Sequence, residues 1–188
     1  MNKTTRKISF AALLTALTII FLYASALFPS GQLGFIAAAS LFTAAAIIET
    51  GISGGLIVFL GSSILAELLL PNKGLLLLYI LFFGYYPIVK SLVEKLGSML
   101  LEWVLKLVIF NIALSVVCFV LSNIIFGVSI PDMKAVLVFL DIIFNVSAPK
   151  WNTIILYIAG NMVFQVFDFG LSKLIWFYIE RVSKKVRK

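Results

Sequence analysis

The residues best suited to do chemistry are polar side chains inside strongly apolar segments. Within the apolar run 151–178, Tyr157, Asn161, Gln165 and Asp168 recur at spacings of four, four and three. This spacing places the four side chains on one face of a helix. Phenol, amide and carboxylate groups on one face can hydrogen-bond a small organic molecule, or they can bond a neighbouring helix. The sequence leaves both roles open for this stripe.

Other apolar runs carry further candidate groups. Glu67 follows Ser63 by one helical turn, and Tyr79, Phe83 and Tyr86 form an aromatic stripe. Together with the amides, they predict an outward-opening cavity for a small molecule with a planar apolar body. The predicted substrate-binding residues are Glu67, Tyr79, Phe83, Asn123, Trp151, Tyr157, Asn161 and Gln165.

Each of these groups also has a simpler interpretation. Glu67 is close enough to a turn to be hydrated, and the aromatic stripe can serve core packing or an interfacial belt. Trp151 can be an interface anchor or part of a lid. Asp168 lies at a depth similar to that of Lys90 and Lys106, so we expect it to form an internal ion pair.

Composition decides the class of protein that positions these groups. The chain has 188 residues, of which 62% are hydrophobic and 12% charged, against about 25% charged in a soluble domain. It is therefore predicted to be an all-α integral membrane protein, with residues 1–188 forming a single transmembrane domain. The net charge of +7 does not indicate nucleic acid, because the basic residues cluster at helix ends.

Catalysis and metal chemistry are the least expected functions. The chain has no His and a single Cys, and its eight acidic residues are dispersed. It has no Walker loop, no Gly-x-Ser-x-Gly elbow and no His-bearing metal motif. We therefore expect no enzyme activity, no resident metal and no cofactor.

Six transmembrane helices fit this length, since about 20 apolar residues cross a bilayer. Pro87 is expected to kink or end the fourth helix, because proline removes a backbone hydrogen bond. The connection 127–150 contains an apolar stretch, 133–146, that is too short to span and is either interfacial or re-entrant. The predicted spans are 8–28, 33–49, 54–70, 75–95, 103–126 and 151–178.

The basic residues predict the orientation. An even number of spans places both termini on one side. Ten Lys and Arg residues lie on that side, at the termini and in the fourth-to-fifth connection, against three on the other side. By the positive-inside rule both termini are predicted to be cytoplasmic, with the connection 127–150 outside. The mixed-charge segment 90–102 is interpreted as a connection, and the basic tail as a contact for anionic membrane lipid.

The first apolar run, 8–28, contains a pattern of small residues that suits contact with another helix. It is longer than the 7 to 15 apolar residues of a signal peptide, so we interpret it as a retained span. Ala12 and Ala16 lie one helical turn apart and would let another helix approach closely. The opening residues 6–17, RKISFAALLTAL, resemble the Ala-xxx-Ala first helix of the substrate-binding S components of energy-coupling factor (ECF) vitamin transporters.

The resemblance covers the whole chain as architecture and only this stretch as a motif. It implies a six-helix membrane protein that captures a vitamin or related micronutrient from outside. It also implies an ECF transmembrane T subunit and two cytoplasmic ATPases as partners, with Ala12 and Ala16 docking the T subunit. A chain without a nucleotide site needs such an ATPase to accumulate its substrate. The competing interpretation is a non-catalytic membrane scaffold similar to the rod-shape protein MreD, in which the polar stripes only join helices.

Overall fold

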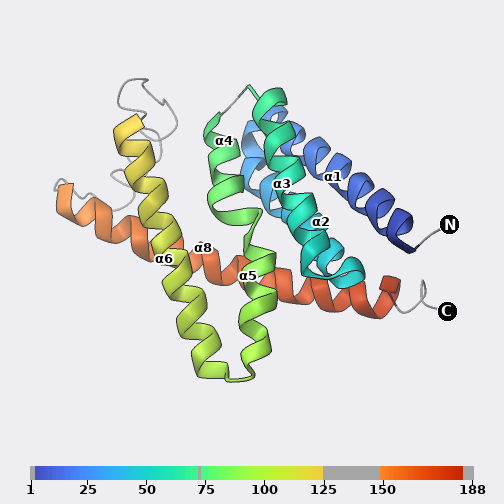
Figure 1. The fold of residues 1–188 in the computed structure, drawn as a ribbon. Coiled ribbons are helices and arrows are strands. Elements are labelled where there is room, and N and C mark those ends of the chain that lie inside the picture. The colour runs from blue at the N-terminus through green and yellow to red at the C-terminus, as the bar shows by residue number, and fades with distance from the viewer. Residues whose placement is uncertain (1–2, 72, 125–148, 184–188) are drawn as a thin grey trace.

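The computed structural model describes residues 3–71, 73–124 and 149–183, and within them every regular element is helical (Figure 1). Six helices in these three segments are long and apolar enough to cross a membrane by length and composition. The prediction of an all-helical protein with six membrane-length helices is therefore confirmed for the residues that the structure describes. The predicted connection 127–150, including 133–146, lies outside the described residues except for its last two, which begin the final helix.

The helices follow the predicted spans closely. The structure has α1 (Lys3–Leu27), α2 (Gln32–Thr50), α3 (Ile52–Leu69), α4 (Lys73–Leu78), α5 (Tyr86–Val93), α6 (Met99–Ile124) and α8 (Pro149–Tyr178). Short 3-10 turns lie at η1 (Pro29–Gly31) and η3 (Glu94–Leu96), and single π turns at η2 (Tyr79–Phe83) and η4 (Ile179–Ser183).

Glycine determines how α2 turns into α3. Gly51 has a φ of +86°, a backbone conformation that other residues rarely adopt, and its N–H bonds the Ile47 carbonyl at 2.9 Å. Four residues later, a Cβ added to Gly55 would lie 2.4 Å from Cγ1 of Ile47. The two helices therefore approach closely at their joined ends because one of them has no side chain there.

The fourth span is broken before its proline. The α4 helix passes into the π turn η2, and Pro87 occupies the first turn of α5, where its missing N–H costs no helical hydrogen bond. The break lies at Gly84, where a Cβ would be 2.8 Å from ring atoms of Phe59 and Tyr79. The predicted interruption is present, and the glycine lets the chain turn against these two rings.

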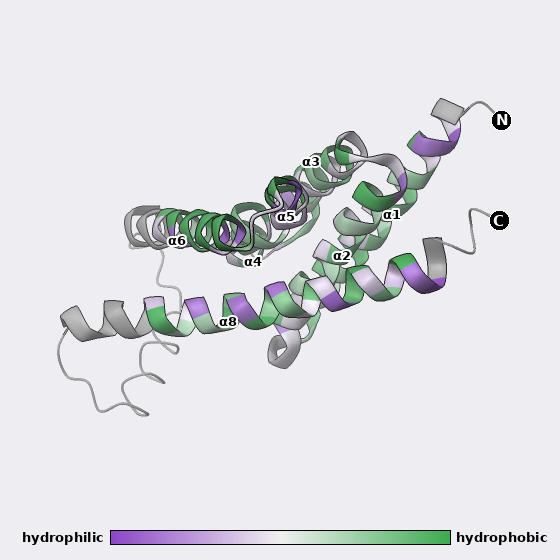
Figure 2. Cartoon of the chain, turned by 90° about the horizontal axis from the view of Figure 1, so that it is seen from below, coloured by the Kyte–Doolittle hydropathy of each residue, from purple (hydrophilic) through white to green (hydrophobic). Residues whose placement is uncertain are grey.

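Helices α1, α2 and α3 all contact one another, and α4 contacts each of these three. Helix α5 contacts α2, α3 and α6. Helix α8 crosses behind α5 and α6 in Figure 1 and also contacts α2. Viewed from below, α6, α4, α5 and α3 form a row, and α8 lies along one side of it (Figure 2).

An aromatic core joins η2 and α6 to α8. Phe82 of η2 lies 5.1 Å from Phe110 of α6 and 5.9 Å from Phe164 of α8, ring centroid to ring centroid. Phe110 and Phe164 are stacked at 4.5 Å. Aromatic pairs of this kind add about 0.5–1.5 kcal/mol beyond the area they bury. This core brings the polar faces of α5, α6 and α8 together.

Candidate functional site

Four charged side chains meet where α5, α6 and α8 converge. Glu94 of η3 accepts from Lys90 of α5 and from Lys106 of α6, each at 2.8 Å from Nζ to Oε1. Asp168 of α8 pairs with Lys90 through Oδ1 and with Lys106 through Oδ2, the latter at 3.5 Å. We call Lys90, Glu94, Lys106 and Asp168 the charge quartet. The expected ion pair of Asp168 is confirmed.

Two neutral side chains, Tyr86 and Ser172, form hydrogen bonds with members of the charge quartet. The Tyr86 hydroxyl donates to Oδ1 of Asp168 at 2.6 Å, and Lys90 donates to Oγ of Ser172 at 2.8 Å. Both lysines are buried, with Lys90 only 2% exposed. An uncompensated charge near the centre of a bilayer costs about 2.5–3.5 kcal/mol on insertion scales. The two positive and two negative charges cancel, so the quartet holds three helices together without a net buried charge.

The interpretation of residues 90–102 as a connection is wrong at both ends, because α5 continues to Val93 and α6 begins at Met99. Lys90 lies in α5 and is buried in the bundle, so it does not serve as a loop charge in the orientation argument. The signal was present in the sequence, because Tyr86, Lys90 and Glu94 are spaced by four and share a helical face. The sequence did not show that this face points inward.

Two pairs of polar residues continue the contact between α6 and α8. Asn111 and Asn161 exchange side-chain hydrogen bonds at 3.0 and 3.1 Å between Nδ2 and Oδ1. Ser115 Oγ and Tyr157 Oη lie 2.7 Å apart. Gln165, the third residue of the predicted binding stripe, is exposed. Tyr157 and Asn161 therefore have partners within the protein, and their role toward a ligand stays a prediction.

The aromatic candidates are buried. Tyr79 is fully buried, and its hydroxyl lies 2.8 Å from Oγ of Ser62 on α3. The Phe83 ring lies 4.6 Å from Phe82 and 4.9 Å from Phe167, centroid to centroid. Both side chains contribute to the core in this structure.

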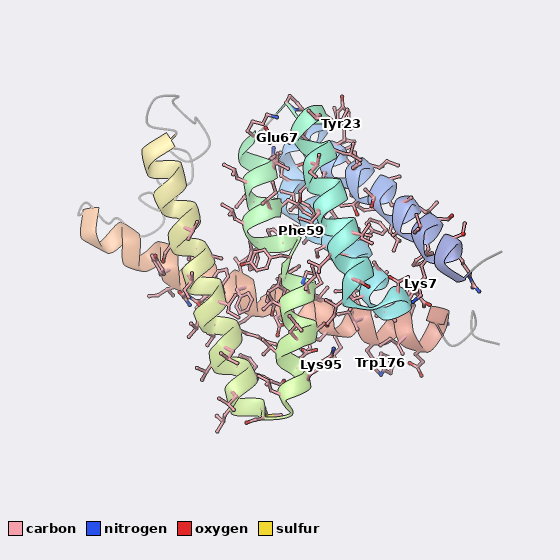
Figure 3. All side chains as sticks on the ribbon, viewed as in Figure 1. Lys7, Tyr23, Phe59, Glu67, Lys95 and Trp176 are labelled. Carbon is pink, nitrogen blue, oxygen red and sulfur yellow. The ribbon has the colours of Figure 1, made fainter. Side chains whose placement is uncertain are left out.

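The remaining predicted binding residues are Glu67, Asn123 and Trp151. Glu67 is exposed at the turn between α3 and α4, where it pairs with Lys73 at 3.0 Å. Figure 3 shows Glu67 and Tyr23 at one end of the bundle and Lys95 and Trp176 at the other. Asn123 and Trp151 belong to α6 and α8, but their side chains lie outside the described part of the chain. The structure thus brings Tyr157 and Asn161 together through α6 and leaves Glu67 at a separate place.

Two shallow apolar grooves lie on α6. One, of about 470 Å³, is lined by Asn111 and Ser115 among aliphatic side chains. The other, of about 400 Å³, lies between α6 and the η2 region and includes Tyr85. Both volumes fall in the range of about 300–1,000 Å³ typical of small-molecule sites. Among the described residues, no group of three or more His, Cys, Asp and Glu is placed to hold a metal ion.

The outer surface of α1 presents the predicted docking residues. Ala12 and Ala16 are exposed, whereas Ala11, Leu14, Thr15 and Thr18 on the opposite face are buried. Thr15 and Thr18 donate to carbonyls of their own helix, at 2.9 and 2.8 Å. The described segments of the chain therefore leave the face with Ala12 and Ala16 uncovered.

Comparison with protein-family models, with curated proteins and with solved structures finds no match for this chain.

Proposed function

We propose that this protein is the membrane-embedded substrate-binding subunit of an ECF-type importer. In this role it captures a vitamin or related micronutrient outside a bacterial plasma membrane, with both termini in the cytoplasm. It delivers the substrate together with a transmembrane T subunit and two cytoplasmic ATPases. The proposal is supported by six membrane-length helices and by the resemblance of residues 6–17 to the first helix of that family.

The observation that carries the proposal is the exposed pair Ala12 and Ala16 on α1. The neighbouring side chains Ile8, Leu13 and Ile20 are 61%, 59% and 60% exposed. Small residues between large apolar ones form a notch into which a partner helix can pack closely. A partner helix would fill this notch, so the notch favours docking at this face.

Substrate contact is proposed for the polar residues along α8. Tyr157 and Asn161 meet Ser115 and Asn111, which line the larger groove on α6, and Gln165 is exposed on the same helix. These hydrogen bonds can be exchanged for bonds to a ligand at small net cost, because coupling between such groups in membrane proteins averages about 0.6 kcal/mol.

The docking proposal is tested by Ala12→Trp, with Leu60→Trp as the control. Leu60 is 53% exposed on α3, so its tryptophan adds similar bulk to another outer surface. Each variant is purified from its host under mild extraction, and co-purifying membrane subunits and ATPases are quantified. We expect Ala12→Trp to lose the partners and Leu60→Trp to keep them. Equal recovery of partners by both variants would show that the α1 face does not dock these partners.

A second candidate function is the scaffold similar to MreD. It is favoured by one observation, that Asn111, Ser115, Tyr157 and Asn161 satisfy one another across α6 and α8. A scaffold needs these residues only to join helices. The two functions differ in whether a stoichiometric small ligand accompanies the purified protein.

A further inference from the structure

A third groove lies apart from the proposed docking and substrate residues, between the end of α2 and the end of α8. Its walls are Leu41, Ala44, Ala45 and Ile48 of α2 with Leu174, Ile175, Phe177 and Tyr178 of α8. All of these side chains are apolar, apart from the hydroxyl group of Tyr178. Leu174 and Phe177 are 49% and 51% exposed, so the groove opens at the outer surface of the helix bundle.

The size of the groove limits its occupant. Its volume is about 200 Å³, below the roughly 300–1,000 Å³ of sites that enclose a whole small molecule. A flexible hydrocarbon chain fits such a narrow apolar space with part of its length and continues into the bilayer. The occupant therefore has an acyl chain, and its remaining groups lie at the groove's end.

The positively charged side chain of Arg181 lies at that end of the groove. The Arg181 guanidinium lies over the Phe177 ring, 5.6 Å from its centroid, and Phe177 lines the groove. Arg181 is exposed and has no acidic partner among the described residues. A guanidinium at a membrane surface binds a phosphate group well, because its fork of N–H donors matches the phosphate oxygens.

A negatively charged side chain, that of Glu49, lies near the same end of the groove. Glu49 directly follows the groove residue Ile48, and its helix α2 contacts η4, the turn that contains Arg181. Its Oε1 atom is buried, and no hydrogen bond reaches it from the described part of the protein. A buried carboxylate oxygen without a donor is costly, so a rotation of the partly exposed Glu49 side chain toward a ligand that brings a donor would be favourable.

We propose that the groove binds an ethanolamine phospholipid. One acyl chain lies between α2 and α8, the phosphate meets Arg181, and the primary ammonium donates to Glu49. Among the ethanolamine, glycerol and choline headgroups, only ethanolamine supplies both an anion and a compact cation with N–H donors. The serine headgroup has both as well, but it adds a carboxylate that Glu49 would repel. A glycerol headgroup has no cation, and choline carries its charge without a donor. The inference does not depend on the proposed transport function.

Native mass spectrometry of the delipidated protein tests this inference. Phosphatidylethanolamine, phosphatidylglycerol and phosphatidylcholine with identical acyl chains are added back separately, and the retained lipid is quantified. We expect phosphatidylethanolamine to bind most tightly, with about fivefold weaker retention in Arg181→Gln, the order of one exposed charge pair. Glu49→Gln is expected to abolish the preference for ethanolamine over choline.

Lys173→Gln is the matched control. Lys173 also lies over an aromatic ring of α8, 5.4 Å from the centroid of Phe169, but neither residue lines the groove. It should leave lipid retention unchanged. Equal binding of the three lipids by the wild-type protein would overturn the proposal without any variant, as would tighter binding of phosphatidylglycerol. An equal loss in Lys173→Gln and Arg181→Gln would reduce the effect to general surface charge and also overturn it.

Discussion

Asn111 and Asn161 are 50 residues apart in the chain, yet each donates an amide N–H to the other's side-chain oxygen, at 3.0 and 3.1 Å. Each amide also donates to a backbone carbonyl of its own helix, at 2.8 Å in both cases. The pair therefore fixes the rotation of α6 against α8. It belongs to the same interface as the charge quartet, in which polar contacts occur together with the stacked rings of Phe110 and Phe164.

A double-mutant cycle measures how much the amide pair contributes to the free energy of unfolding. We expect Asn111→Ala and Asn161→Ala to be coupled by about 0.6 kcal/mol in the free energy of unfolding, the average for polar pairs in membrane proteins. Equilibrium unfolding in detergent micelles gives the four required values. A coupling near zero would show that the reciprocal bonds add nothing beyond packing.

Asp168→Ala should be among the most destabilising changes to a charged residue. It leaves the buried Lys90 with Glu94 as its remaining acidic partner in the described structure, and removing one partner of a buried pair costs about 3–5 kcal/mol. We expect a loss of about 3 kcal/mol in the free energy of unfolding. The double change Lys90→Met with Asp168→Leu should recover most of it, because Lys106 and Glu94 still neutralise each other.

An exposed ion pair supplies the control for the quartet. Lys73 and Glu67 have side chains that are 52% and 59% exposed. Lys73→Gln should therefore cost less than about 1 kcal/mol in the same unfolding measurement. A cost equal to that of Asp168→Ala would mean that burial does not decide the strength of these pairs.

Gly84→Ala tests the break in the fourth span. The new Cβ would lie 2.8 Å from rings of Phe59 and Tyr79, and Tyr79 is fully buried, so we expect a loss of about 1–3 kcal/mol in unfolding free energy. Gly34→Ala in α2 is the control, because nothing lies within 4 Å of its added Cβ. That change should be neutral or stabilise by up to about 1 kcal/mol. Equal effects at both glycines would contradict the packing described at Gly84.

Tyr79→Phe separates a buried hydrogen bond from the packing of the ring. The change removes the contact with Ser62, whose hydroxyl keeps its 3.1 Å bond to the Phe59 carbonyl. We expect unfolding to become easier by about 0.5–1.5 kcal/mol. Tyr23→Phe, at a side chain 47% exposed, should stay within about 0.5 kcal/mol. Unchanged stability in Tyr79→Phe would show that the Ser62 contact is not stabilising.

The helical spans were predictable because about 20 consecutive apolar residues have few other ways to satisfy their backbone in lipid. The predicted span 33–49 became Gln32–Thr50, and 151–178 became Pro149–Tyr178. The π turn at Tyr79–Phe83 was not predictable, since it depends on how Gly84 packs against α3. Hydropathy reports which residues enter lipid and says nothing of such contacts.

The site was predictable only as a set of helix faces. The spacing of Tyr157, Asn161 and Asp168 gave one face of α8, and the structure shows these residues bonded to α5 and α6. Periodicity could not distinguish a face that meets another helix from a face that meets a ligand, because both need the same hydrogen-bonding groups. For the same reason, the stripe of Tyr79 and Phe83 could be placed on one side of a helix but not assigned to the core.

The most direct test of the central proposal is native mass spectrometry of the protein extracted mildly from its own host. We predict a stoichiometric small-molecule adduct and a complex that contains a membrane subunit and two ATPases. An unliganded chain accompanied by cell-wall or division proteins would contradict the importer proposal and leave the polar residues of α6 and α8 as helix-joining contacts of a scaffold.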